Sequence, residues 1–174
     1  MKINRRITIN APVADVWNIL GPNYADAGNW NSAVYVSCAS QGTQNAASAP
    51  VAGRVCQTSL GPFTESIEDY DKAAHRIRYT ATGDAMPGFV KNLAGHWARK
   101  SVNGNQTEVD MTLSADISFP FNLLMGPMMK MQFNGAVKST LGDLKHYAET
   151  GKPHPRKLKA DASKKGIAAR QASA

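Results

Sequence analysis

The chain has 174 residues, of which 43% are hydrophobic and 19% are charged, a balance typical of one globular domain. No run of residues approaches the ~18 consecutive apolar positions that a membrane-spanning helix needs. The first ten residues include three basic side chains, but no apolar segment follows them, so we expect no secretory signal and a cytoplasmic location. Two cysteines are too few for a disulfide scaffold or a cysteine-based zinc site.

The formal net charge of +7 is concentrated near the C-terminus. Residues 152–174 hold seven basic residues and one acidic residue, whereas residues 1–151 hold 13 basic and 12 acidic residues. The C-terminal segment has almost no large apolar side chain with which to order itself. We therefore predict one domain, residues 1–150, and a basic, disordered tail, residues 151–174. This tail is either a solvated extension or an electrostatic arm for nucleic acid or an anionic membrane.

The N-terminal part of the chain predicts a strand and two short helices. Residues 2–10 alternate between apolar and polar side chains, which favours a strand with one buried face. Residues 11–20 have the outline of a helix, with Pro12 in the first turn and Gly21 at the end. Residues 24–30 are expected to form a second short helical or looped segment.

The middle of the chain predicts six more strands, connected by turns and loops. The expected strands are residues 33–39, 54–60, 63–70, 75–81, 89–101 and 106–117. Asn103-Gly104-Asn105 is a strong hairpin signal between the last two strands. Apolar and polar residues alternate strictly in the last strand, which is typical of an antiparallel sheet with one solvated face.

A single long helix is predicted for residues 120–149. Its apolar residues recur at steps of three and four: Met129, Phe133, Val137, Leu141, Leu144 and Ala148. Gly126-Pro127 should kink or break the helix, and Gly151 should end it. Because only this helix is available to cover the antiparallel sheet, the sequence predicts an α+β layer fold.

Several segments in this order resemble a known superfamily. They are residues 9–17 (Ile-Asn-Ala-Pro-Val-Ala-Asp-Val-Trp), Trp30, Gly53-Arg54, residues 65–71 with 75–79, and the Leu141…Leu144-Lys145…Glu149 ending. The chain resembles the SRPBCC superfamily (START-like, Bet v 1-like) and, within it, the polyketide cyclase/dehydrase and lipid transport family. The resemblance covers about residues 3–150 and depends most on residues 9–17.

The resemblance implies a helix-grip fold with an apolar cavity. A seven-stranded antiparallel sheet would wrap around the long C-terminal helix, with two short helices after the first strand. Many members of the family are bacterial, so we expect a bacterial protein. Strand parity places Glu65, Ile67, Ile77, Tyr79, Leu93, Trp97, Met111 and Leu113 on the inner face, and Met125, Met129 and Phe133 of the long helix face it. In the topology that the resemblance implies, Phe89 lies in a loop near the mouth of the cavity. Together with Trp30 of the resemblance, these are the predicted ligand-binding residues.

Methionines are concentrated at the start of the predicted long helix. Four of the seven lie within seven residues: Met125, Met128, Met129 and Met131. Methionine is flexible and polarisable, so such a cluster suits a surface that adapts to varied apolar molecules. The alternative is that these side chains only pack in an ordinary core.

Glu65 is the polar residue of most interest, because strand parity places its carboxylate on the inner face of the sheet. A buried carboxylate is costly unless it is paired. Glu65 could anchor a ligand hydroxyl or amine, or act as a general base. The alternative is a structural ion pair at the sheet edge with Arg54, Arg76 or Arg78.

Two other residues are candidates for acid–base chemistry. Tyr79 is expected on the inner face, whereas His96 lies beside Trp97 and should face outward unless a β-bulge reverses it. Cys38 and Cys56 are expected to be buried, reduced thiols. We predict no metal and no cofactor.

Three functions remain open from the sequence. The first is binding of a small hydrophobic or amphipathic ligand, such as a lipid, a polyketide, an aromatic or a steroid-like molecule. The second is a polyketide cyclase/dehydratase-like enzyme that uses the same cavity, with Glu65 as the acid or base. The third places the activity in the basic tail. The oligomeric state is left open.

Overall fold

The computed structural model describes residues 1–84 and 86–173 and has the predicted α+β architecture. The strands are β1 (Lys2–Ile9), β2 (Val34–Ala39), β3 (Gly53–Thr58), β4 (Gly61–Asp71), β5 (Arg76–Thr82), β6 (Val90–Asn103) and β7 (Gln106–Ile117). The helices are α1 (Val13–Leu20), the 3-10 helix η1 (Tyr24–Asn29), α2 (Phe121–Leu124), α3 (Gly126–Thr150), α4 (Pro155–Asp161) and α5 (Lys164–Gln171).

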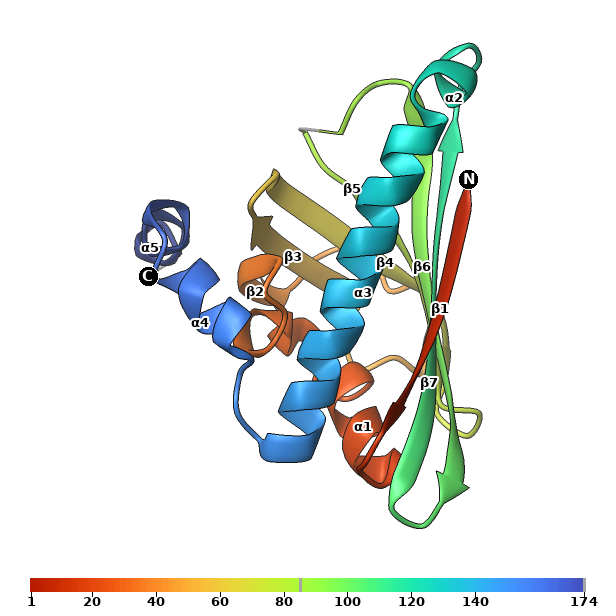
Figure 1. Cartoon of the computed structure of the whole chain (residues 1–174), viewed down its shortest axis with the longest axis vertical. Helices are drawn as coiled ribbons and strands as arrows, with labels where there is room; N and C mark the ends of the chain where they lie inside the picture. The colour runs from red at the N-terminus through yellow and green to blue at the C-terminus, as the bar shows by residue number, and fades with distance from the viewer. Residues whose placement is uncertain (85, 174) are drawn as a thin grey trace.

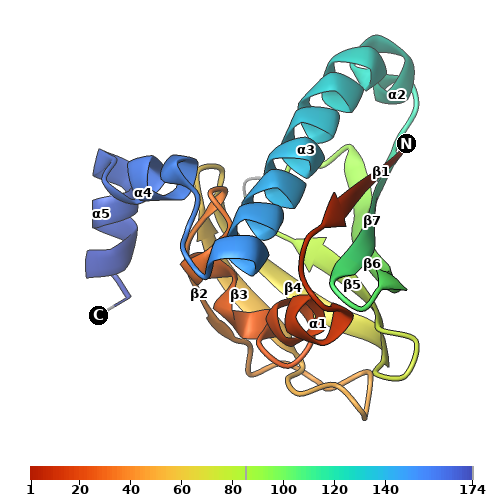
Figure 2. The same ribbon diagram turned by 60° about the horizontal axis from the view of Figure 1, so that its bottom comes forward.

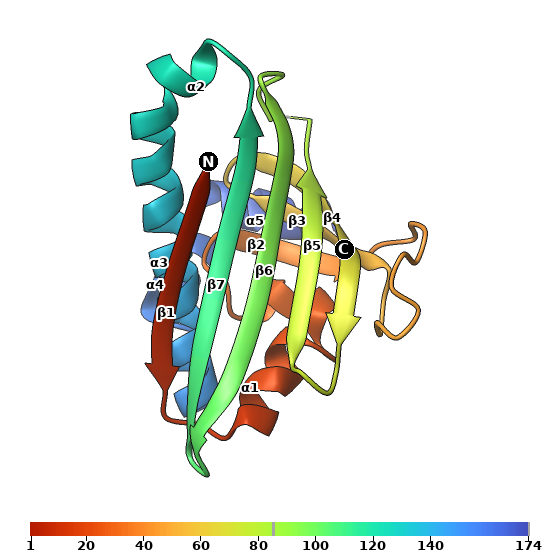
Figure 3. The ribbon, with the colours of Figure 1, turned by 90° about the vertical axis from the view of Figure 1, so that its right-hand side faces the viewer.

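The strands form one antiparallel sheet in the order β1-β7-β6-β5-β4-β3-β2. β1 and β2 therefore lie at opposite edges, and α1 and η1 carry the chain from one edge to the other (Figure 1). β6 and β7, the two longest strands, run side by side along the length of the molecule (Figure 3). The sheet curves around α3, which lies against its inner face (Figure 2). This arrangement confirms the predicted helix-grip fold.

The inner face of the sheet is apolar because the strands alternate as predicted. On β7, Val109, Met111 and Ala115 are buried, whereas Asp110 and Thr112 between them face the other side. Leu144 of α3 is completely buried against this core. Side chains of successive strand residues point to opposite faces, so the alternation in the sequence directly decides which face meets α3.

Trp17, at the end of the segment of residues 9–17, anchors that segment to the sheet. Its ring is buried and lies 5.2 Å from the ring of Tyr70. The guanidinium of the buried Arg99 stacks over the Trp17 ring at 3.9 Å and donates to the carbonyl of His75 at 2.7 Å. α1 is therefore anchored to β4, β6 and the β4–β5 turn at one end of the sheet.

The predicted long helix is broken near its start, as Gly126-Pro127 indicates. Met125 separates α2 from α3, and Pro127 occupies the first turn of α3. Gly151 ends α3 in the left-handed conformation, with a φ of 68°. Within residues 1–84 and 86–173, no helix combines the length and the apolar character needed to cross a membrane.

The C-terminal tail differs from the expectation of disorder. It forms α4 and α5, and α5 contacts the edge strand β2 (Figures 1 and 2). The His154 and Ser163 side chains cap the two helices by accepting hydrogen bonds from the backbone. Composition failed to predict this order because the residue that anchors the tail is a lysine.

Lys157 is only 1% exposed and attaches the tail to β2. Its ammonium donates to the carbonyl of Val34 at 2.7 Å and to the Asp161 carboxylate at 2.6 Å. Burial lowers the pKa of Lys157, and the hydrogen bond to Asp161 opposes this shift. A second contact joins Arg156 of α4 to the fully buried Asp143 of α3 at 2.8 Å. Paired charges, rather than buried apolar side chains, therefore attach the tail to the domain.

Candidate functional site

An apolar cleft of about 410 Å³ opens between α3 and the ends of the strands. Its lining comes from the β3–β4 turn, the start of β4, the β5–β6 loop, the start of β6, Met125 and the first turns of α3. The lining residues are Leu60, Phe63, Met86, Pro87, Phe89, Val90, Leu93, Met125, Met128, Met129, Gln132 and Phe133. Gln132 is the one polar side chain among these, so the cleft suits an apolar molecule.

Five residues that the sequence predicted as ligand contacts line this cleft: Phe89, Leu93, Met125, Met129 and Phe133. Three of the four clustered methionines, Met125, Met128 and Met129, therefore line the cleft, where an adaptable surface would be useful. That these residues contact a ligand stays a prediction.

The other expected apolar contacts do not line the cleft, which corrects the predicted extent of the cavity. Trp30, Ile67, Ile77, Trp97 and Met111 are buried in the main core, and Leu113 packs against it. Aromatic rings fill the space there, because the same core also contains Trp17, Tyr24, Tyr70 and Tyr79. The apolar cleft lies beside the start of α3, toward the α2 end of the molecule.

Glu65 lies on the inner face of β4, one inward position beyond Phe63. It forms an ion pair with Arg54 of β3, at 2.8 Å from the arginine Nε to Oε2 of the carboxylate. The Tyr24 hydroxyl donates to the same oxygen at 2.5 Å. Arg54 also donates to the Tyr24 carbonyl at 2.8 Å, and its guanidinium lies 4.2 Å from the Tyr24 ring. These three residues form a closed polar cluster.

The sheet register brings the polar cluster together. Arg54 and Glu65 are direct partners across β3 and β4. Tyr24 is buried on η1, which packs against β3. The structure thus selects Arg54 from the three arginines that the sequence offered as partners for Glu65. Sequence reasoning missed Tyr24 as a partner of Glu65, because the pattern of a short 3-10 helix does not show which way one of its side chains faces.

Tyr79 faces inward as predicted, and its ring lies over Gly95 of β6. A Cβ added at Gly95 would lie only 2.1 Å from the Tyr79 ring, so glycine leaves the room that the ring occupies. The ring centroids of Tyr79 and Tyr24 are 6.0 Å apart. Tyr79 therefore borders the polar cluster, and its predicted role toward a ligand stays a prediction.

Burial governs the ionisation of the polar cluster. It raises the pKa of Tyr24 well above its ordinary value, and the Glu65 carboxylate raises it further. The same two causes raise the pKa of Tyr79. Burial alone would lower the pKa of Arg54, but the surrounding groups, Glu65 first among them, raise it overall. At neutral pH the two tyrosines are hydrogen-bond donors, and Arg54 is a permanent cation.

His96 lies on the outer face of the sheet, as strand parity predicts, so it does not belong to the catalytic candidates. It borders a polar surface depression that also contains Arg6, Glu108 and Asp110. Burial lowers the pKa of His96, and Arg76 adds to this shift. Because the sheet separates His96 from the cleft, it cannot exchange a proton with a molecule bound there.

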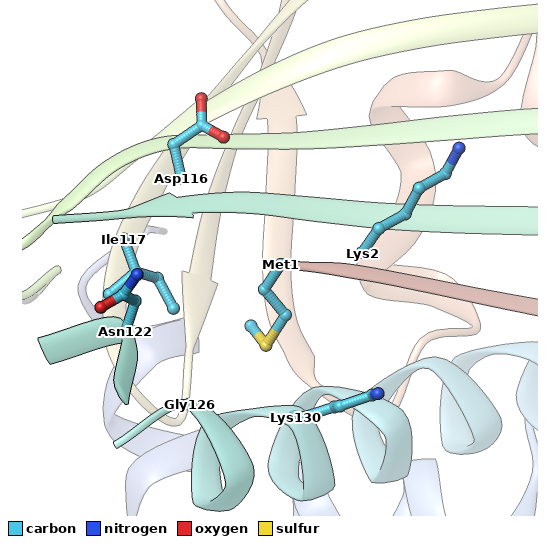
Figure 4. Close-up of a pocket in the computed structure, with 7 residues that line it drawn as sticks. All are labelled: Met1, Lys2, Asp116, Ile117, Asn122, Gly126 and Lys130. Carbon is cyan, nitrogen blue, oxygen red and sulfur yellow. The ribbon is translucent and has the colours of Figure 1, made fainter. Parts of the chain in front are cut away.

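A second depression lies between the first residues of β1 and the start of α3 (Figure 4). Met1 points toward α3 in this region, whereas the charged ends of Lys2 and Asp116 point away from it (Figure 4). Lys130 extends along α3. Because the polar groups diverge rather than face a common point, this depression is a poor candidate for a ligand site.

The two cysteines differ from each other, which corrects the expectation that both are buried. Cys56 is 1% exposed, whereas Cys38 is exposed near the end of the edge strand β2. Burial raises the pKa of the Cys56 thiol to about 12.

We therefore expect N-ethylmaleimide to label one thiol of the native protein and both thiols after unfolding, because the thiolate is the reactive form. Mass spectrometry of the peptides measures this. Fast labelling of Cys56 in the native state would contradict the burial of that thiol.

Comparisons with known proteins agree with this architecture. Residues 1–149 match the polyketide cyclase/dehydrase and lipid transport family. No curated protein matches the chain. A START superfamily protein from Mycobacterium smegmatis is similar in structure, with a TM-score of 0.68 and 12% identity over 85% of this chain and 97% of that one.

Two enzymes are among the other similar structures. The di-domain ARO/CYC BexL from the BE-7585A biosynthetic pathway has a TM-score of 0.67 and 17% identity, over 84% of this chain and 45% of that one. Norcoclaurine synthase from Thalictrum flavum, a point mutant in complex with a transition state analogue, has a TM-score of 0.63 and 9% identity, over 85% of this chain and 93% of that one. At such identities the likeness concerns the fold alone.

Proposed function

The chain belongs to the polyketide cyclase/dehydrase and lipid transport family, and from this premise we propose that it binds a small hydrophobic or amphipathic molecule in the apolar cleft. The observation that carries the proposal is the cleft, whose volume of about 410 Å³ falls within the roughly 300–1,000 Å³ of small-molecule sites. Burial of ligand surface would provide about 25 cal/mol per Å² before ordering costs are subtracted.

The polar cluster does not line the cleft, but Glu65 lies one inward position of β4 beyond the cleft residue Phe63, so the cluster would orient a ligand that extends past the apolar lining. Tyr24 and Arg54 both donate to Oε2 of Glu65, and within the described chain no hydrogen bond reaches Oε1. The Glu65 side chain is 14% exposed although it faces inward. Oε1 is thus available to accept a hydrogen bond. Because Arg54 already neutralises the carboxylate, a neutral hydroxyl is a better partner than a second cation.

The cyclase-like alternative would use Glu65 as a general base, and the contacts of Glu65 argue against it. A proton on Glu65 would break the ion pair with Arg54 at 2.8 Å. Tyr24 and Tyr79 have raised pKa values, so neither is a ready proton acceptor at neutral pH. His96 faces the other side of the sheet. Without a second acid or base, binding is favoured over turnover.

Titration with Nile red, an apolar fluorescent probe, tests the binding site. We expect Met125→Gln to weaken probe binding by about tenfold, because the amide must lose its hydration in an apolar cleft. Met131→Gln is the matched control: Met131 is 70% exposed and does not line the cleft, so the same change there should leave the dissociation constant unaltered. Equal dissociation constants for the two variants, or no probe binding by the native chain, would contradict the proposal that the cleft is the binding site.

A further inference from the structure

The end of the molecule beside the cleft carries large apolar side chains in water. Phe119 is 80% exposed, Leu123 74% and Leu124 73%. Met128 and Met131, in the first turns of α3, are 46% and 70% exposed. These five residues are called the apolar tip here. Isolated exposed apolar residues are ordinary, but five of them within residues 119–131 indicate an interaction surface.

The apolar tip is a projection rather than a groove. α2 lies at one extreme of the longest axis of the molecule, beyond the end of β7 (Figures 1 and 3). Phe121 of α2 stacks on Phe89 of the β5–β6 loop, with ring centroids 4.7 Å apart. The backbone N–H of Ser118 also donates to the Phe89 carbonyl at 2.9 Å. The tip is therefore held in place against the wall of the cleft.

The apolar tip is continuous with the mouth of the cleft. Met128 is half exposed and also lines the cleft. Leu60, on the opposite wall, is 70% exposed. The tip therefore borders the exposed side of the cleft at Met128.

The charges around the apolar tip favour an anionic surface. Residues 117–142 contain two lysines, Lys130 and Lys138, and no acidic residue. Lys2 lies across from Lys130 beside the tip, in the region shown in Figure 4. The nearby carboxylate of Asp116 accepts a hydrogen bond from Asn92, and its side chain points away from α3.

We propose that the apolar tip inserts into the surface of a lipid bilayer, with its lysines toward acidic headgroups and the mouth of the cleft facing the lipid. Exposed apolar residues beside lysines are the pattern of segments that lie in the bilayer interface. A second copy of the chain is a poorer occupant, because a stable dimer buries roughly 20–30 residues on each side and a projection of five side chains supplies few of them. The inference goes beyond the proposed function, because insertion needs no ligand in the cleft.

Flotation of the full chain with vesicles of phosphatidylcholine and phosphatidylglycerol tests the proposal. We expect the native protein to float with the vesicles. The double variant Leu123→Ser/Leu124→Ser should partition at least about tenfold less, because two apolar side chains no longer enter the lipid. Both positions are more than 70% exposed, so the fold should be retained. Nile red binding in solution should also be unchanged, which separates this proposal from the ligand site.

The matched control is Leu158→Ser/Ile167→Ser, which removes two exposed apolar side chains from the tail helices. These residues are 55% and 47% exposed and lie on α4 and α5, away from the tip (Figure 1). This variant should float like the native protein. Equal flotation of both double variants, or no flotation of the native protein, would overturn the proposal. So would a native dimer that Leu123→Ser/Leu124→Ser dissociates, since this would assign the tip to a second copy.

Discussion

Replacement of Arg54 by methionine should lower the free energy of unfolding by about 3–5 kcal/mol, because it leaves the Glu65 carboxylate in the interior without its counter-ion. The two side chains are only 8% and 14% exposed, so water can replace little of the lost interaction. The hydrogen bond from Arg54 to the Tyr24 carbonyl would be lost as well. Urea unfolding followed by tryptophan fluorescence measures the change.

Two further variants identify the cause of this loss. Arg54→Met/Glu65→Met removes both charges and should recover most of the stability, since the isolated charge and not the missing pair is costly. Arg76→Met breaks the exposed pair with Asp71 and should cost less than about 1 kcal/mol. If the double variant is as unstable as Arg54→Met, the unpaired carboxylate is not the reason, and the cluster is less tightly coupled than its distances imply.

Addition of a single methyl group at Gly53 should also be strongly destabilising, by about 3 kcal/mol. A Cβ at this position would lie 1.9 Å from the carbonyl oxygen of Glu65, which belongs to the neighbouring strand β4. The obstacle is backbone, so β3 and β4 would have to separate beside the Arg54–Glu65 pair. Thermal unfolding of Gly53→Ala measures the loss of stability.

Gly135→Ala is the matched control for Gly53→Ala. Gly135 lies inside α3, and a Cβ there would meet no atom of the described chain within 4 Å. The same substitution should therefore raise stability by up to about 1 kcal/mol, because alanine favours a helix interior over glycine. Opposite signs for the two variants are the expected result. A stable Gly53→Ala protein would show that the two strands are not in close contact at that point.

The polar cluster also explains why Gly53-Arg54 stands out in the sequence. The glycine lets β3 approach β4 closely, and the arginine next to it reaches the carboxylate of its direct partner Glu65. Gly53 thus allows the two strands to lie close together, and Arg54 supplies the positive charge. Both are needed to keep a carboxylate on the inner face of the sheet, where a ligand could use its free oxygen.

The fold could be predicted from the sequence because its signals are local. Strict alternation in residues 106–117, the Asn-Gly-Asn hairpin and the apolar stripe of residues 129–148 each depend on neighbours within a few positions. The break at Gly126-Pro127 and the stop at Gly151 follow from the backbone chemistry of single residues. Strand parity likewise placed Glu65 and Tyr79 inward and His96 outward.

Only the tertiary structure decided where the protein has open space and how its tail is held. Trp30, Trp97 and Met111 are inward as predicted, but whether such side chains line a cavity or fill it depends on the volumes of rings from several distant elements. The tail is ordered because Lys157 reaches a carbonyl 123 residues earlier in the chain. Composition describes the average tendency of a segment, whereas a single buried, paired cation depends on a partner that lies far away in the sequence.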